Sequence, residues 1–174
     1  MQKVATYVLT AIVPLIIILG VFNFLIFLND SEVIDYVLTG KTIENTSLTE
    51  DELTHLEDVK SLVQIEKIIL YALLTLAILL FFILKKKVFN PMYYGGIITV
   101  GAILILFLLV IFSFDFAFTI FHKTLFRNDL WLLPTGSKLL ELFPKEYFVN
   151  FAKKLGLYST IISLLLIIIG RFKR

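Results

Sequence analysis

Residues 88–114 read VFNPMYYGGIITVGAILILFLLVIFSF, a stretch without a single acidic or basic side chain. A helix needs about 20 apolar residues, at about 1.5 Å each, to cross the roughly 30 Å of hydrocarbon in a membrane. This stretch meets that length without help from its neighbours. It therefore predicts a membrane-spanning helix, and the sequence on either side of it must lie at opposite membrane surfaces.

The composition of the whole chain points the same way. Of the 174 residues, 59% are hydrophobic and 17% are charged, and none is cysteine. A soluble domain has roughly 45–50% apolar and about 25% charged residues. The composition therefore excludes a soluble globular domain and a disordered chain, and the lack of cysteine excludes a disulfide scaffold.

Three more stretches are free of charge, at 4–29, 68–84 and 155–170. The first is long enough to span; a cleaved signal peptide is the alternative, but its apolar core is typically about 7–15 residues, and no A-x-A-like site follows here. The other two span if flanking charged side chains lie at the headgroup level. We predict a single all-α integral membrane domain, 1–174, with four transmembrane helices. They are placed at about 4–28, 62–84, 92–114 and 148–170.

The charges predict the orientation. Basic residues without acidic neighbours occur near the N-terminus, in the turn 85–91 and at the C-terminus: Lys3, Lys85, Lys86, Lys87, Arg171, Lys173 and Arg174. The positive-inside rule places these three regions, and hence both termini, in the cytoplasm. Segments 30–61 and 115–146 then face outward, where we expect them to form a small extracellular cap.

The predicted spans carry no charge near their centres, which argues against a pump, a coupled transporter or a voltage sensor. Their few polar side chains are expected to hydrogen-bond between helices. These are Asn23, Thr75, Thr99 and Ser163. The sequence also has no glycine-rich phosphate loop and no basic patch typical of nucleic-acid binding.

Both histidines of the chain fall in the outer segments, His55 in the first and His122 in the second. Around His55, the spacing of Thr49 and Glu52 fits a capping box, so we predict one helix from about residue 49 into the second span. On that helix His55 and Asp58 share a face, and the carboxylate can orient the imidazole and raise its basicity. The alternative is a solvated helix start in which both side chains face water.

Aromatic residues gather between Phe112 and Phe151, among them the only tryptophan, Trp131. One interpretation is the aromatic belt of a membrane interface. The other is a water-poor pocket beside His122, in which imidazole chemistry is stronger than in water. Lys123 and Arg127 are interpreted as interfacial residues or lipid-phosphate contacts rather than as catalysts.

The residue types limit the possible chemistry. Two histidines without a third ligand at standard spacing are a weak zinc signal, so we expect neither a metal nor a cofactor. A thiol nucleophile is excluded, and a Ser–His pair stays open, although no serine sits in a G-x-S-x-G setting. Acyl transfer remains, in which one histidine takes a proton and the other stabilises charge or returns a proton.

Three motifs, in order, resemble the lipoprotein intramolecular transacylase family of bacterial membrane proteins. They are THLEDVKSL (54–62), FHKTLFRNDLWLLP (121–134) and LLELFPKEYF (139–148). The resemblance implies transfer of the sn-2 acyl chain of a diacylglyceryl-modified lipoprotein to the α-amine of its N-terminal cysteine, which leaves a lyso-form N-acylated lipoprotein. It implies a multi-pass protein of the bacterial cell membrane with its active site at the outer face. Its partners would be the lipoprotein substrate and membrane lipids, with no nucleic acid and with the oligomeric state left open.

The resemblance also implies site residues. The family's two catalytic histidines correspond to His55 and His122, and Phe126 and Trp131 match motif positions that would line the pocket. Asp58 would support His55, and Tyr36 is a further candidate. We expect His122 to deprotonate the amine and His55 to act on the ester, although the roles can be exchanged.

Two other functions stay open: a membrane binding or assembly protein without catalysis, and another lipid acyltransferase.

Overall fold

The structure is a computed structural model, and it describes residues 1–29, 31–41 and 47–173. In these residues every regular element is helical, which confirms the all-α prediction. The helices are α1 (Gln2–Phe27), α2 (Glu32–Thr39), α3 (Glu50–Leu84), a 3-10 turn (Lys85–Val88), α4 (Phe89–Leu125), α5 (Lys138–Leu142) and α6 (Lys145–Lys173). Residues 30 and 42–46 of the first predicted cap segment, and Arg174 of the basic tail, lie outside the described residues.

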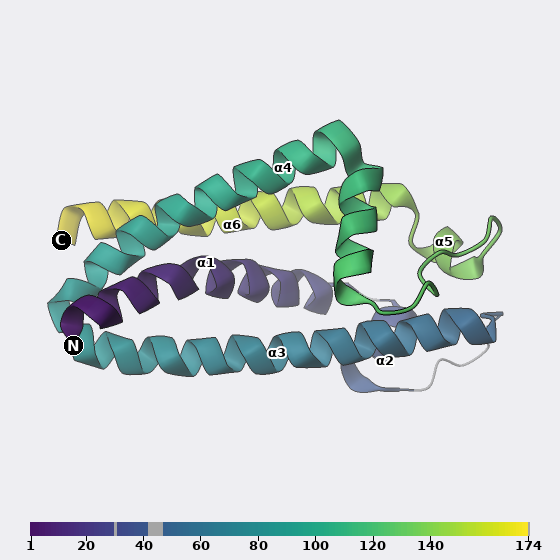
Figure 1. The fold of residues 1–174 in the computed structure, drawn as a ribbon, viewed down its shortest axis with the longest axis horizontal. Helices are drawn as coiled ribbons and strands as arrows, with labels where there is room; N and C mark the ends of the chain where they lie inside the picture. The colour runs from purple at the N-terminus through teal and green to yellow at the C-terminus, as the bar shows by residue number, and fades with distance from the viewer. Residues whose placement is uncertain (30, 42–46, 174) are drawn as a thin grey trace.

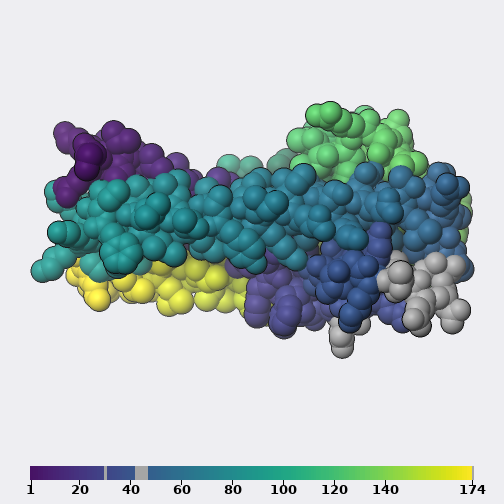
Figure 2. Space-filling model, turned by 90° about the horizontal axis from the view of Figure 1, so that it is seen from below, coloured from purple at the N-terminus to yellow at the C-terminus, as the bar shows by residue number. Residues whose placement is uncertain are grey.

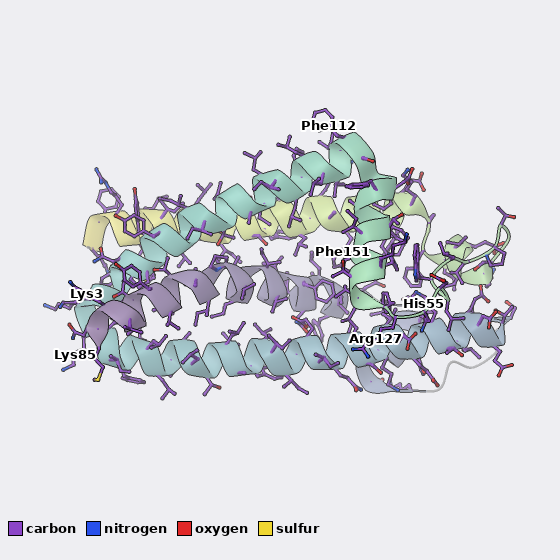
Figure 3. All side chains as sticks on the ribbon, in the orientation of Figure 1. Lys3, His55, Lys85, Phe112, Arg127 and Phe151 are labelled. Atoms are coloured by element: carbon purple, nitrogen blue, oxygen red, sulfur yellow. The ribbon has the colours of Figure 1, made fainter. Side chains whose placement is uncertain are left out.

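The four long helices lie side by side, and α1 contacts each of the other three (Figure 1). Both chain ends and the Lys85–Val88 turn lie at one end of the bundle. Lys3 and Lys85 are therefore at the same end, while His55 and Arg127 are at the opposite one (Figure 3). This arrangement gathers the predicted cytoplasmic charges on one side and the predicted site residues on the other.

Among the described residues, three helical stretches are long and apolar enough to cross a membrane: Gln2–Phe27, Glu50–Leu125 and Lys145–Lys173. The second contains both α3 and α4, which fold back on each other at the turn between them. The described part of the chain is therefore a bundle of apolar helices, as expected for an integral membrane protein.

Small residues let α4 approach its neighbours closely. A Cβ atom added to Gly95 would lie 2.6 Å from Val13 Cβ of α1, and one added to Gly96 would lie 2.9 Å from the Ser163 carbonyl oxygen of α6. Ser159 and Ser163 of α6 are fully buried in the same packing. Along this part of α4 the helices are thus packed so closely that no side-chain atom fits at the two glycines.

The polar side chains of the helices only partly behave as predicted. Asn23 Nδ2 donates to Glu66 Oε2 of α3 at 2.7 Å, which confirms one interhelical hydrogen bond. The prediction is wrong for Thr75, Thr99 and Ser163, whose hydroxyls donate to the carbonyl four residues earlier in their own helix. A short hydroxyl side chain reaches that carbonyl more easily than it reaches a neighbouring helix.

The turn between α3 and α4 is shorter than the predicted 85–91. Lys85 ends α3 with a φ of 51°, and α4 already begins at Phe89. Asn90 and Pro91 are therefore in the first helical turn rather than in the connection. A proline is tolerated there because its missing N–H would have no partner within the helix.

α4 breaks at Ser113, where φ is −158° and ψ is 75°, next to the predicted end of the third span at 114. Beyond this break the helix turns and runs across the end of the bundle toward α3 (Figure 1). Seen from below, this part of α4 and the loop after it lie against the N-terminal turns of α3 (Figure 2). The break therefore carries His122 toward His55.

Candidate active site

The first turns of α3 place His55. Thr49 caps the helix, and its side chain and that of Glu52 form the predicted capping box. His55 follows one turn later and is 7% exposed. The alternative of a solvated helix start is therefore wrong for His55, because its imidazole is buried.

His122 lies in the part of α4 beyond Ser113 and is also 7% exposed. Its ring centroid is 6.2 Å from that of His55, and the two rings are inclined by 35°. Two buried imidazoles from different helices thus lie side by side.

Aromatic rings surround the pair. The Phe126 ring lies 5.2 Å from His55 and 5.5 Å from His122, centroid to centroid. The Trp131 ring stacks on His122 with a centroid distance of 5.0 Å, and the Phe118 ring lies against His122 with a centroid distance of 4.0 Å. These rings are aromatic surroundings of the kind expected beside His122, while Phe112, at 81% exposed, is one of the aromatics that fit the belt interpretation.

A hydrogen bond decides which nitrogen of His122 carries the proton. His122 Nδ1 lies 2.8 Å from the Phe118 carbonyl oxygen. Because a carbonyl only accepts, Nδ1 must donate, and in the neutral ring Nε2 keeps its lone pair. His122 is thus held in the tautomer that a general base needs.

Asp58 does not orient His55 by a hydrogen bond. Asp58 Oδ2 accepts from Asn128 Nδ2 at 2.8 Å, so this carboxylate joins α3 to the loop after α4. Nδ1 of His55 is buried, and no described residue hydrogen-bonds it. The prediction that Asp58 orients the imidazole is therefore wrong, whereas its predicted effect on basicity is present, because the charge of Asp58 raises the pKa of His55.

The surroundings keep both imidazoles neutral. Burial lowers the pKa of His55 below 6.5, the nearby His122 lowers it further, and the Asp58 charge raises it in part. Burial also lowers the pKa of His122, against the raising effect of its hydrogen bond to the Phe118 carbonyl. An aromatic pocket disfavours the charged form of a ring that it removes from water.

Glu52 fixes the loop that carries Trp131. Its buried carboxylate accepts hydrogen bonds from the Ser137 hydroxyl and the Leu139 N–H of α5, as well as from the N–H and hydroxyl of Thr49. Burial alone would raise the pKa of this carboxyl, but these hydrogen bonds lower it to about 2. The capping-box spacing identified Glu52, but it gave no sign of the contact with α5.

Tyr36, a further candidate from the sequence, does not join the histidines. Its ring lies on the α2 side of α3, where Lys60 Nζ is 4.7 Å from its centroid. Burial raises the pKa of its hydroxyl, and the charge of Glu57 adds to that. Within the described ranges, no three histidine, aspartate or glutamate side chains come together as ligands for a metal ion.

Two residues of this region were missed in the sequence. Phe118 has a usable signal, because it precedes His122 by four residues and so shares its helical face. Asn128 lies inside the FRNDLW motif, but its contact with Asp58 depends on how the loop returns to α3.

Comparison with known proteins identifies the family. Residues 25–148 match the family model of the lipoprotein intramolecular transacylase Lit. The structure resembles the in meso structure of the membrane integral lipoprotein intramolecular transacylase Lit from Bacillus cereus, with a TM-score of 0.86 and 22% identity over 99% of this chain and 95% of that one. It also resembles a variant of that protein in which one histidine is replaced by alanine, with a TM-score of 0.82 and 20% identity over 99% and 93% of the two chains.

At these identities the solved structures show a shared fold. A search of curated proteins gave no significant match. The family model covers most of the chain, including both histidines, so this protein belongs to the lipoprotein intramolecular transacylase family and is an acyltransferase of the membrane.

Proposed function

We propose that this protein moves the sn-2 acyl chain of a diacylglyceryl-modified lipoprotein to the α-amine of the same molecule's N-terminal cysteine, with His55 and His122 as catalytic residues. The observation that carries the proposal is the pairing of the two buried imidazoles, 6.2 Å apart, inside an aromatic wall. The product is a lyso-form N-acylated lipoprotein.

The reaction needs one proton acceptor and one proton donor. The amine nitrogen attacks the ester carbonyl carbon and forms the C–N bond, and Nε2 of His122 takes the proton that the nitrogen loses. The bond from the carbonyl carbon to the glyceryl oxygen then breaks, and that oxygen receives a proton through His55. Starting from the neutral amine, the proton that His122 takes replaces the one that His55 gives, so no proton is gained or lost overall and both histidines end neutral.

Confinement supplies much of the remaining rate enhancement. Donor ester and acceptor amine belong to one substrate, so a pocket that holds them close together replaces a chance encounter. Phe118, Phe126 and Trp131 exclude water around His122, which strengthens the polar interactions with the developing charge.

We further propose four membrane spans, formed by α1, α3, α4 up to Ser113 and α6, with both termini in the cytoplasm. Segments 30–61 and 115–146 then form an outer cap with the active site. In support, the Lys85–Val88 turn lies at the opposite end of the bundle from His55. Because the chain has no cysteine, single cysteines test this cleanly.

For the topology test, Lys138→Cys should react with an impermeant maleimide in intact cells and Lys86→Cys only after lysis. Both side chains are exposed, so a difference in labelling reports the side of the membrane. Labelling of position 86 from outside would contradict the proposed orientation.

For the activity test, the chain is expressed in a host that lacks lipoprotein N-acylation, and lipoprotein N-termini are analysed by mass spectrometry. We expect N-acylated cysteine on a monoacylglyceryl group. Diacylglyceryl lipoproteins with a free amine would contradict the proposal and favour a non-catalytic membrane protein. N-acylation without loss of the sn-2 chain would indicate an acyltransferase with another donor.

A further inference from the structure

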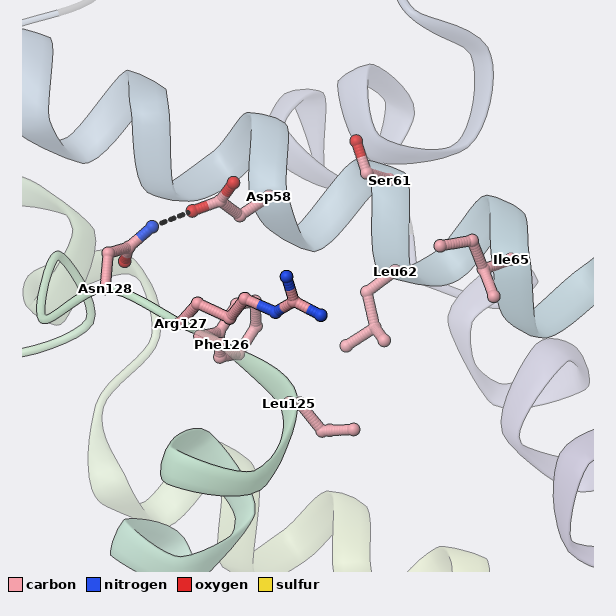
Figure 4. A pocket seen from close by; sticks show the side chains of 8 residues that line it. All are labelled: Asp58, Ser61, Leu62, Ile65, Leu125, Phe126, Arg127 and Asn128. Carbon is pink, nitrogen blue, oxygen red and sulfur yellow. Dashed lines mark hydrogen bonds between the residues drawn. The ribbon is translucent and has the colours of Figure 1, made fainter.

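A groove opens beside the histidines, between α3 and the end of α4. Its volume is about 270 Å³. We call it the α3–α4 groove, and it is lined by Asp58, Ser61, Leu62, Ile65, Leu125, Phe126, Arg127 and Asn128 (Figure 4). Phe126 lines this groove and also contacts both histidines, so one ring connects the groove with the histidine pair.

The groove is polar at one end and apolar at the other. Along α3 it runs from Asp58, near the outer end of the bundle, to Ile65, closer to the hydrocarbon (Figure 4). Leu62 and Leu125 face each other across the apolar part, and Asn128 bonds Asp58 at the polar part. This order matches an amphiphile whose head lies outward and whose chain points into the membrane.

Arg127 supplies the donors of the groove. Its guanidinium extends into the space between Asp58 and Leu62 (Figure 4). In the described part of the chain, no carboxylate forms an ion pair with it. A guanidinium offers five N–H donors in a fixed plane and suits carbonyl or anionic oxygens.

We propose that the α3–α4 groove is the binding subsite for the acyl-glyceryl end of the lipoprotein substrate. Its acyl chain lies along Leu62, Ile65 and Leu125, and its carbonyl oxygens accept hydrogen bonds from Arg127. The Asp58 carboxylate attracts the α-ammonium of the substrate, which loses one proton to water to give the neutral amine that attacks the ester. This inference rests on the proposed function and adds where the substrate lies.

The charges of the groove favour this ligand over a phospholipid phosphate. Asp58 and Arg127 carry opposite charges in one small space, so their sum is close to zero. A phosphate would gain from Arg127 but would be repelled by Asp58. A lipoprotein end offers one cation and several carbonyl oxygens, which satisfies both side chains.

Binding is tested without catalysis. In a His122→Ala background, Ile65→Cys is exposed to a diacylglyceryl lipopeptide with a thiol-reactive group near the end of its sn-2 chain. The matched control is Ile69→Cys, one turn deeper on α3, also exposed but outside the groove. We expect labelling of position 65 to exceed that of position 69 at least about tenfold. Equal labelling would overturn the groove proposal even if the enzyme transfers acyl chains.

Kinetics test the two ends of the groove separately. Ile65→Trp fills the apolar end, so we expect kcat/KM to fall about tenfold for a long sn-2 chain and little for a two-carbon one, with Ile69→Trp unchanged for both. Arg127→Gln should raise KM about tenfold at nearly constant kcat. Lys123→Gln, four residues earlier in the last turn of α4, should leave KM unchanged.

Two results would overturn the proposal here. One is an equal effect of Ile65→Trp on long and short chains. The other is inhibition of the wild type, but not of Arg127→Gln, by vesicles of an anionic phospholipid, which would assign the guanidinium to a lipid phosphate. If the wild type itself transfers no acyl chain, the proposed function is contradicted. The labelling experiment would then still show whether the groove binds the lipopeptide.

Discussion

The two parts of α4, on either side of Ser113, are made of different residues and do different work. Before the break, Gly95 and Gly96 bring the backbone against α1 and α6, with no space for a Cβ atom. After it, Phe118 and His122 present large rings that meet other rings at centroid distances of 4–6.5 Å. Close backbone packing fixes the helices against one another, whereas ring packing surrounds the two histidines and removes them from water.

Removal of either histidine should give the largest effect. The change should lower transacylation and leave the stability of the helix bundle unchanged. We expect His55→Ala and His122→Ala each to lower transacylation by about 10²–10⁴-fold, because general acid–base catalysis supplies gains of that size. Mass spectrometry of lipoprotein N-termini gives the rate, and protein levels in the membrane should match the wild type. Lys123→Ala, next to His122 but exposed, serves as the control. Full activity in a histidine variant would remove that residue from the mechanism.

The pH dependence should show how strongly the aromatic rings exclude water from the two histidines. The reaction needs a neutral base, and burial lowers the pKa of both imidazoles below 6.5. Between about pH 8 and 6.5, kcat/KM should therefore fall only as the substrate α-amine, with a pKa of about 8, becomes protonated. Protonation of the histidines should add a second, steeper fall below 6.5, the acid limb of the profile.

Trp131→Ala sharpens this experiment, because it exposes His122 and should shift the acid limb upward toward 6.5. If the acid limb of the wild-type kcat/KM lies at or above pH 6.5, and lies at the same pH in Trp131→Ala, the aromatic rings around His122 have no electrostatic role.

A methyl group added where helices pack closely, away from the histidines, should lower stability rather than activity. A Cβ atom at Gly170 of α6 would lie 2.8 Å from the Phe89 carbonyl oxygen and 2.9 Å from the Tyr93 nitrogen, and neither backbone atom can move away easily. Gly170→Ala should cost about 1–3 kcal/mol, as expected for overpacking. Gly101→Ala, with nothing within 4 Å, should be neutral or slightly stabilising. Thermal unfolding in detergent compares the two, and equal Tm values would contradict the close approach.

Substitution of Glu52 should give the smallest effect, because it weakens only the hydrogen bonds that join α3 to Ser137 and Leu139, after the loop that carries Trp131. Its pKa of about 2 means that the bonded carboxylate stabilises the fold fully above about pH 4.5, and that this contribution is lost as the pH falls toward 2. Trp131, the only tryptophan, reports the loop by its fluorescence.

In Glu52→Gln we expect a stability loss of about 1 kcal/mol at pH 7 and a weaker fluorescence change between pH 4.5 and 2. Glu50→Gln, exposed in the same turn, should behave like the wild type. A Glu52→Gln titration identical to the wild type would show that the carboxylate does not hold α5.

Much of the fold follows from local pattern. Charge-free length predicts membrane helices because hydrocarbon cannot solvate charge, and the Thr49–Glu52 spacing predicts where α3 begins because a capping box needs only local atoms. The two candidate histidines were also available at once, since the chain has only two.

Contacts between distant segments could not be read in the same way. Asp58 shares a face with His55, yet it bonds Asn128, because the loop after α4 returns to that side of α3. Tyr36 lies beside Lys60 and away from the pocket, because α2 packs on another face of α3.

The sequence by itself determined the helical membrane class, the family and the pair of histidines, because apolar length, charge placement and short motifs are local properties. Only the tertiary structure decided that the break at Ser113 brings His122 to 6.2 Å from His55, and that Glu52 and Asn128 hold the surrounding loop. These contacts join residues far apart in the chain, and their geometry is set by packing and closure of the whole bundle rather than by any one segment.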